Sequence, residues 1–146
     1  MLAPNMHRRT RLSRLLTTLP FATYRDIYSD GIEAPPGLRW LHTAGQVALR
    51  ADGSVPATFA EQCEQALANL TAVLDAAQMS PPDIVKLTCY VVGTQDLDVL
   101  YAARRAQLRG SAPAATVIVV QALAAPDFLV EIEAVAAADG SHGQPT

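Results

Sequence analysis

The sequence predicts an α+β domain in which two helices pack on one face of a mixed sheet. Two segments carry apolar residues at helical spacing, and several others show the alternation or the apolar runs of strands. Their order along the chain is three strands, a helix, a strand, a helix and two strands. A chain of 146 residues with 50% hydrophobic residues can bury a core of this kind.

The first strands are expected to be short. The segment "TYRDIYS", at 23–29, is consistent with a short exposed strand, and "GIEAPPG" makes a turn with a possible strand at Gly31–Glu33. The segment "LRWLHTAGQVAL", at 38–49, is rich in bulky residues and predicts a strand that is broken at Gly45.

The two helices have recognisable ends. Thr58 and Glu61 have the spacing of a capping box, and apolar residues then recur at steps of three and four from Phe59 to Ala77. A second helix is expected from about Asp96 to Leu108, with Gly110 as its C-terminal stop.

The last three strands are more hydrophobic. "DIVKLTCYVV", at 83–92, alternates and has one more polar face, whereas "AATVIVVQAL", at 114–123, is apolar on both faces. The chain closes with "FLVEIEAVAA" at 128–137. Because two helices can cover only one face of such a sheet, the other face is expected to be buried by another subunit.

The charge distribution excludes some partners. The net charge is −3, but four of the 11 basic residues, Arg8, Arg9, Arg11 and Arg14, lie near the N-terminus, which leaves 7 basic against 14 acidic residues. The rest of the chain therefore carries a negative net charge, which is a poor match for the phosphate backbone of a nucleic acid. No apolar run is long enough for a membrane span, and Cys63 and Cys89 are expected to be free thiols in a reducing, cytoplasmic compartment.

Three parts of the chain are distinguished. Residues 1–20 are interpreted as a flexible basic arm, 21–138 as the folded domain and 139–146 as a disordered tail. The Arg-rich, acid-poor composition of the arm is also typical of a transit peptide, and that alternative stays open.

Five quoted stretches together resemble the RidA/YjgF family of reactive-intermediate deaminases. They are "YSDGI", "HTAGQVALRADGSVP", "FAEQCEQALANLTAVLDAAQMSPPDIVKLTCYVV", "PAATVIVV" and "LVEIEAVA", and they cover about 28–137. The resemblance implies a chorismate-mutase-like homotrimer with a pocket at each subunit boundary. It also implies cofactor-free hydrolysis of enamine or imine intermediates to 2-keto acids and ammonia.

The resemblance assigns roles to individual residues. Glu131 would orient or activate water, while Tyr28 and the backbone at Gly45 would shape the pocket. The family's substrate-binding Arg follows "PA", where this chain has Ala115, and the position often occupied by Cys is Val117. His42, close to Gly45, is a candidate for the pocket rim, with a structural role as the alternative.

The residues alone leave these roles open. Glu131 and Glu133 share a strand face, where they could serve a site or simply meet solvent. Three interpretations of the missing arginine at position 115 stay open. Another arginine could supply the positive charge, the ligand could lack a carboxylate, or the site could be non-catalytic. The arginines considered for this role are Arg39, Arg104, Arg105 and Arg109. No spacing typical of metal ligands occurs.

The sequence therefore predicts a protein that binds a small metabolite, with hydrolytic deamination as the expected reaction if it is an enzyme. Two alternatives remain: a non-catalytic ligand-binding or regulatory trimer that kept the scaffold, and, with less support, a ribonuclease. The acidic body disfavours the ribonuclease.

Overall fold

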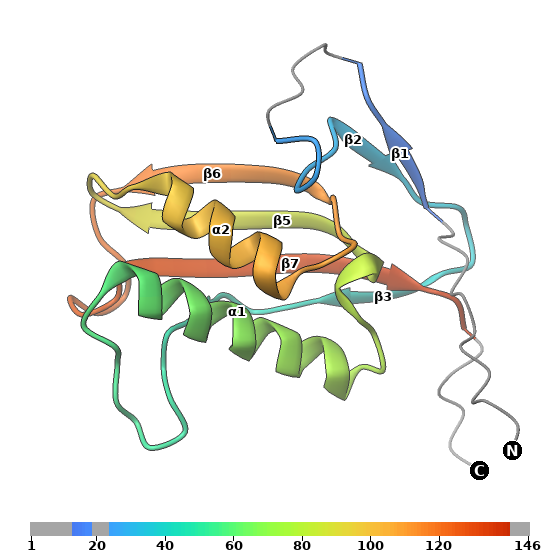
Figure 1. Cartoon of the computed structure of the whole chain (residues 1–146). Helices are drawn as coiled ribbons and strands as arrows, with labels where there is room; N and C mark the ends of the chain where they lie inside the picture. The colour runs from blue at the N-terminus through green and yellow to red at the C-terminus, as the bar shows by residue number, and fades with distance from the viewer. Residues whose placement is uncertain (1–12, 19–23, 141–146) are drawn as a thin grey trace, which may run out of the picture.

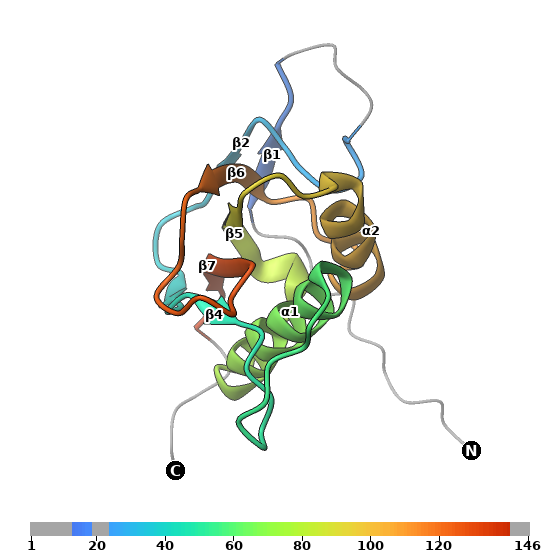
Figure 2. The same ribbon diagram turned by 90° about the vertical axis from the view of Figure 1, so that its left-hand side faces the viewer.

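The computed structural model describes residues 13–18 and 24–140. Its centre is a five-stranded sheet with the strand order β3-β7-β5-β6, to which β4 adds by pairing with β7. Both helices lie on one side of this sheet (Figures 1 and 2). The predicted α+β class, with two helices on one face of a mixed sheet, is confirmed. The bounds are β3 Arg39–His42, β4 Gln46–Val47, α1 Phe59–Ala76, β5 Ile84–Val92, α2 Leu97–Gln107, β6 Ala114–Val120 and β7 Val130–Ala138.

The sheet is mixed because of one crossover. Strands β5 and β6 are parallel and are connected through α2, whereas β7 runs antiparallel to both β3 and β5. The last two strands of the chain are therefore not neighbours, since β5 lies between them (Figure 1). The long strand expected at 38–49 is indeed broken near Gly45, and both of its parts pair with β7.

The hydrophobic core lies between the helices and the sheet. Leu67, Leu70 and Leu74 of α1 are fully buried, as are Leu87 of β5 and Ile132 of β7. Complete burial of one such side chain contributes about 1.5–3 kcal/mol. These side chains therefore fix which face of each helix and strand points inward.

Both helices begin where the sequence predicts. Thr58 accepts a hydrogen bond from the backbone N–H of Glu61 at 3.2 Å, and its hydroxyl donates to the Glu61 carboxylate at 2.7 Å. Asp96 caps α2 by accepting from the N–H of Asp98 at 3.0 Å. Gly110, which follows α2, has φ of +74°, a conformation that favours glycine.

Two expectations near the N-terminus need correction. Tyr24–Ile27 is a turn rather than a strand, because the N–H groups of Ile27 and Tyr28 bond locally to the carbonyl of Tyr24. Residues Arg14–Leu16 lie within the part predicted to be a flexible arm, but they form strand β1. Strand β1 pairs with β2, Gly31–Glu33, in a separate two-stranded sheet.

Several expectations fall outside the described residues. Residues 1–12 and 19–20 of the arm and 141–146 of the tail cannot be compared with the structure.

Within the described residues, no helix is both long enough and apolar enough to span a membrane. A short 3₁₀ helix, η1 Pro81–Asp83, leads from α1 into β5.

Candidate functional site

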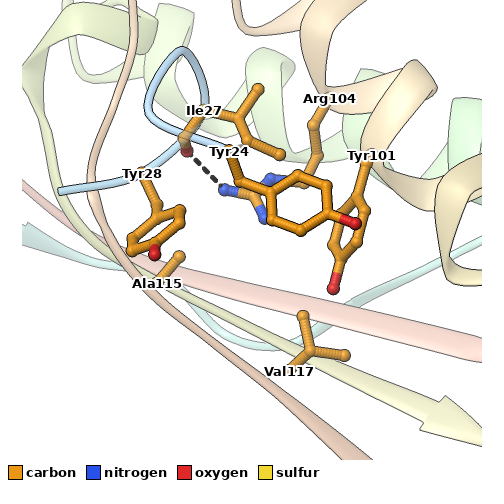
Figure 3. Close-up of a pocket in the computed structure, with 7 residues that line it drawn as sticks. All are labelled: Tyr24, Ile27, Tyr28, Tyr101, Arg104, Ala115 and Val117. Carbon is orange, nitrogen blue, oxygen red and sulfur yellow. Dashed lines mark hydrogen bonds between the residues drawn. The ribbon is translucent and has the colours of Figure 1, made fainter. Parts of the chain in front are cut away.

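A pocket of about 260 Å³ lies between α2, β6 and the turn that precedes β2 (Figure 3). It is smaller than the 300–1,000 Å³ of pockets that hold drug-sized ligands, so it suits a small metabolite. Three residues expected at the site, Tyr28, Ala115 and Val117, line it. The described residues that line it are Tyr24, Ile27, Tyr28, Tyr101, Arg104, Ala115 and Val117.

The floor of the pocket is the helix-facing side of β6. Ala115 pairs with Leu87 and Val117 with Cys89 in the parallel ladder. Paired residues point to the same face, and Leu87 and Cys89 are fully buried beneath the helices. The small side chain of Ala115 therefore leaves open the space that a longer residue would occupy.

Hydrogen bonds to the beginning of β6 hold the turn that carries Tyr28. The buried Ser29 donates from its backbone N–H to the carbonyl of Pro113 at 3.0 Å, and from Oγ to the carbonyl of Ala112 at 2.7 Å. The Arg25 guanidinium lies 5.2 Å from the centre of the Tyr28 ring. These contacts place Tyr28 beside Ala115.

Arg104 brings a positive charge to the pocket. It is only 3% exposed, and one terminal nitrogen donates to the carbonyl of Ile27 at 2.7 Å (Figure 3). Its Nε is buried without a hydrogen-bond partner. Burial lowers the pKa of Arg104, which shows that desolvation of this charge is only partly offset by the groups around it.

The sequence singled out only part of this lining. Tyr24, Ile27 and Tyr101 were not expected there, and Arg104 was one of four arginines considered. Tyr101 and Arg104 are three residues apart and share a helix face, a signal that could have favoured Arg104. Burial raises the pKa of Tyr101, whose ring lies 4.9 Å from that of Tyr24, so its hydroxyl stays protonated near neutral pH.

Glu131 lies on the other side of the sheet. It pairs with Tyr90, which is three positions along β5 from Leu87, so its side chain points away from the face that carries Ala115. We call this side, turned away from α1 and α2, the open face. The structure of one chain therefore does not bring Glu131 to the Tyr28–Ala115 pocket. The open face carries Lys86, Thr88, Tyr90, Thr116, Ile118, Glu131 and Glu133.

Gly45 lies against Glu131, and His42 lies farther along the sheet, so that neither residue lines the pocket. A Cβ atom at Gly45 would be 1.8 Å from Oε1 of Glu131, so the glycine and the carboxylate are in close contact. His42 pairs with Val135 and is exposed on the open face. The six predicted site residues thus divide into two groups on opposite faces of the sheet.

The second carboxylate of β7 has a partner. The hydroxyl of Tyr90 donates to Oε1 of Glu133 at 2.8 Å, and this hydrogen bond raises the pKa of Tyr90. No hydrogen bond or ion pair to the Glu131 side chain occurs among the described residues, so Glu131 has the freer carboxylate of the two.

The two thiols are poor nucleophiles. Cys63 and Cys89 are free and fully buried. Burial raises the pKa of Cys63 to about 12 and that of Cys89 to about 11, so both are protonated at neutral pH. Within 13–18 and 24–140, no group of three His, Cys, Asp or Glu side chains could hold a metal ion.

The architecture and the pocket define a class: a two-layer α+β protein with a metabolite-sized pocket between a helix and an edge strand. Residues 23–138 match the family described as Endoribonuclease L-PSP. The chain belongs to this family, which includes the RidA/YjgF proteins.

Individual relatives agree with this assignment. The chain is 35% identical over 98 residues to the 2-iminobutanoate/2-iminopropanoate deaminase of Escherichia coli, covering 64% of this chain and 76% of that protein. It is 32% identical over 111 residues to a RutC family protein of Pyrococcus horikoshii, covering 75% of this chain and 85% of the relative.

A solved structure is also similar. The Rid family protein YyfB from Yersinia pestis, whose function is described as unknown, superposes with a TM-score of 0.75 at 35% identity. The alignment covers 86% of this chain and 98% of that protein. The resemblance to the RidA/YjgF family is thereby confirmed.

Proposed function

We propose that this protein hydrolyses a small imine or enamine to a keto product and ammonia. The observation that carries the proposal is that Tyr28, Ala115 and Val117 line one pocket with a buried guanidinium. The name of the Escherichia coli relative supports the same reaction. An enamine first tautomerises to the imine. Water then adds to the carbon of the C=N bond, its oxygen stays as the keto group, and its two protons pass to nitrogen, which leaves as ammonia; no cofactor is needed for this balance.

Glu131 is proposed to position the attacking water. A carboxylate can accept a proton from water as it adds to the C=N carbon. Because Glu131 and Ala115 lie on opposite faces of the sheet, a pocket would receive this carboxylate from a neighbouring copy. The proposal therefore includes a homotrimer with its sites at the subunit boundaries.

The surface supports such an assembly. Trp40 is 48% exposed and pairs with Ala137 on the open face, and Ile118 of the edge strand β6 is 41% exposed on the same face. Val119, also on β6, is 62% exposed. Large exposed apolar side chains on a sheet face and on an edge strand are features of a surface that another chain can cover.

The assembly has a direct test. Sedimentation of the purified protein should give the mass of a trimer, and Ile118→Arg should shift it toward the monomer. Ala60→Arg on the exposed surface of α1 is the control and should leave the mass unchanged. A stable monomer at micromolar concentration would rule out the shared site.

The reaction is tested by ammonia release from 2-iminobutanoate generated in situ. Glu131→Gln should lower kcat by about 100-fold, as for the loss of a general base. Glu133→Gln is the matched control on the same strand, and it should change kcat by less than about fivefold because Glu133 is bonded to Tyr90. Equal effects of the two substitutions would remove the role of Glu131.

Ligand-binding and RNA-cleavage assays, run beside the measurement of ammonia release, separate the two alternatives. Ligand binding by the trimer without ammonia release would favour a non-catalytic binder, which the alanine at 115 makes a serious rival. Cleavage of RNA would favour the activity named in the family description. The paired carboxylates of the open face make a phosphate backbone an unfavourable ligand there. The free thiols are consistent with a cytoplasmic location, which is part of the proposal.

A further inference from the structure

Arg104 is a buried cation without a counter-ion. All 14 Asp and Glu residues of the chain lie in the described ranges, and none of them forms an ion pair with Arg104. Asp26, whose pKa Arg104 helps to lower, is already bound by Arg105, with Nε 2.6 Å from Oδ2. A buried charge that lacks a partner costs stability, and such a group beside a cleft is a candidate for a functional site.

The donors of Arg104 are only partly used. A guanidinium has five N–H donors in a rigid plane, and the one hydrogen bond among the described residues runs to the Ile27 carbonyl. Nε is buried and unpartnered. The side chain reaches the pocket from α2, opposite the floor formed by Ala115 and Val117 (Figure 3). Arg104 therefore lines the pocket with a guanidinium that makes one hydrogen bond among the described residues, although Nε itself is shielded from the pocket space.

The other walls restrict what could bind there. Three tyrosine rings, Ile27 and Val117 provide apolar and aromatic surface, and no acidic side chain is among the described residues of the same chain that line the pocket. The volume of about 260 Å³ matches a small ligand. One planar cation facing apolar walls is complementary to a small carboxylate with a short apolar body.

We infer that Arg104 of α2 anchors the carboxylate of the ligand in place of the arginine that is missing at position 115. The charge has moved from the strand to the helix on the facing side of the same pocket, and Ala115 leaves room for the ligand between them. The substrate class is then a small 2-imino monocarboxylate with an apolar side chain. This inference deepens the proposed function and rests on it for the use of the pocket.

The experiment compares two ligands of nearly equal shape. Calorimetric titration measures the binding of 2-oxobutanoate and of its uncharged amide to the native protein. The acid should bind at least about tenfold more tightly than the amide, because only the acid pairs with the guanidinium. Arg104→Gln should abolish this preference while the amide still binds within about twofold of its original affinity.

Two further variants control for structure. Arg105→Gln removes the adjacent exposed arginine, which is paired with Asp26, and should keep the preference. Arg104→Lys keeps the positive charge but loses the planar guanidinium, so the preference for the acid should fall severalfold. If Arg104→Gln does not fold because the hydrogen bond to Ile27 is lost, the Lys variant tests the inference instead. A preference that survives in Arg104→Gln, that is undiminished in Arg104→Lys, or that is absent from the native protein, would overturn the inference.

Ammonia release from 2-iminobutanoate separates this inference from the proposed function. Binding of the acid through Arg104 with no ammonia release would keep the anchor and reject the deaminase. Ammonia release with an unchanged KM in Arg104→Gln would keep the deaminase and reject the anchor.

Discussion

The carboxylate of Glu131 rests against the bare Cα of Gly45. A methyl group at position 45 would come within 1.8 Å of Oε1 and 2.7 Å of the carboxyl carbon of Glu131. The break between β3 and β4 and the direction of the Glu131 side chain therefore depend on each other. Because the atoms in the way are the far end of a flexible side chain, the carboxylate and not the backbone would have to move.

Gly45→Ala is expected to displace the Glu131 carboxylate with little effect on the fold. If Glu131 positions water, kcat for ammonia release should fall at least about tenfold, because a misplaced base loses most of its effect. Thermal melting should change by only a few degrees. In Glu131→Ala/Gly45→Ala, the glycine substitution should add nothing to the loss from Glu131→Ala, and additive effects would show that the two residues act separately.

Ser29→Ala is expected to loosen the wall that carries Tyr28. The substitution leaves the carbonyl of Ala112 without its 2.7 Å bond and costs about 1 kcal/mol of stability. We expect KM or the ligand dissociation constant to rise severalfold, since the turn closes one side of the pocket. Ser54→Ala, in an exposed loop, is the control and should change neither. Unchanged ligand affinity in Ser29→Ala would mean that the other contacts suffice to hold Tyr28.

Gln62 is expected to be important for stability. It is 1% exposed, and its amide donates to the carbonyls of Pro56 and Asp127 and accepts from the N–H of Leu129 at 2.8 Å. Gln62→Met keeps the size but leaves three backbone groups unpaired, which should cost about 2–4 kcal/mol in urea denaturation. Gln65→Met, on a more open side of the same helix, should cost less than about 1 kcal/mol. A small effect at Gln62 would mean that water replaces these bonds.

The two buried thiols predict a loss of stability at high pH. Their pKa values, about 12 for Cys63 and about 11 for Cys89, exceed the value of about 8.5 expected in the unfolded chain. The folded state therefore holds more protons above about pH 8.5, and the stabilisation that is complete below this pH falls as the pH rises toward 11 and 12. Each thiol adds a slope of up to about 1.4 kcal/mol per pH unit.

Denaturation from pH 8 to 11 measures this slope. Cys63→Ala/Cys89→Ala is less stable overall because of the lost volume, but its free energy of unfolding should fall less steeply with pH. Parallel curves for the two proteins would contradict the prediction. The native protein should also resist alkylation by iodoacetamide at pH 8 and react only after unfolding.

Local patterns were sufficient to predict most of the elements. The capping box at Thr58, the stop at Gly110 and the repeated apolar side chains of both segments placed the two helices, because those interactions join residues close in sequence. The turn at Tyr24–Ile27 was mistaken for a strand, since its alternating residues carry no information about the local backbone hydrogen bonds. Strand β1 was missed because it is only three residues long and is defined by its pairing with β2.

The sequence by itself determined the α+β class, the family and the absence of arginine at position 115. Only the tertiary structure decided that Arg104 shares a pocket with Ala115, and that Glu131 points to the opposite face. The reason is that strand order and register bring together segments that are far apart in the chain. Strand β7 inserts between β3 and β5, and its register with β5 sets the direction of the Glu131 side chain. Helix α2 folds back over β6, which brings Arg104 to Ala115. Spacing along a chain cannot show such relationships, because they depend on which surfaces are buried together.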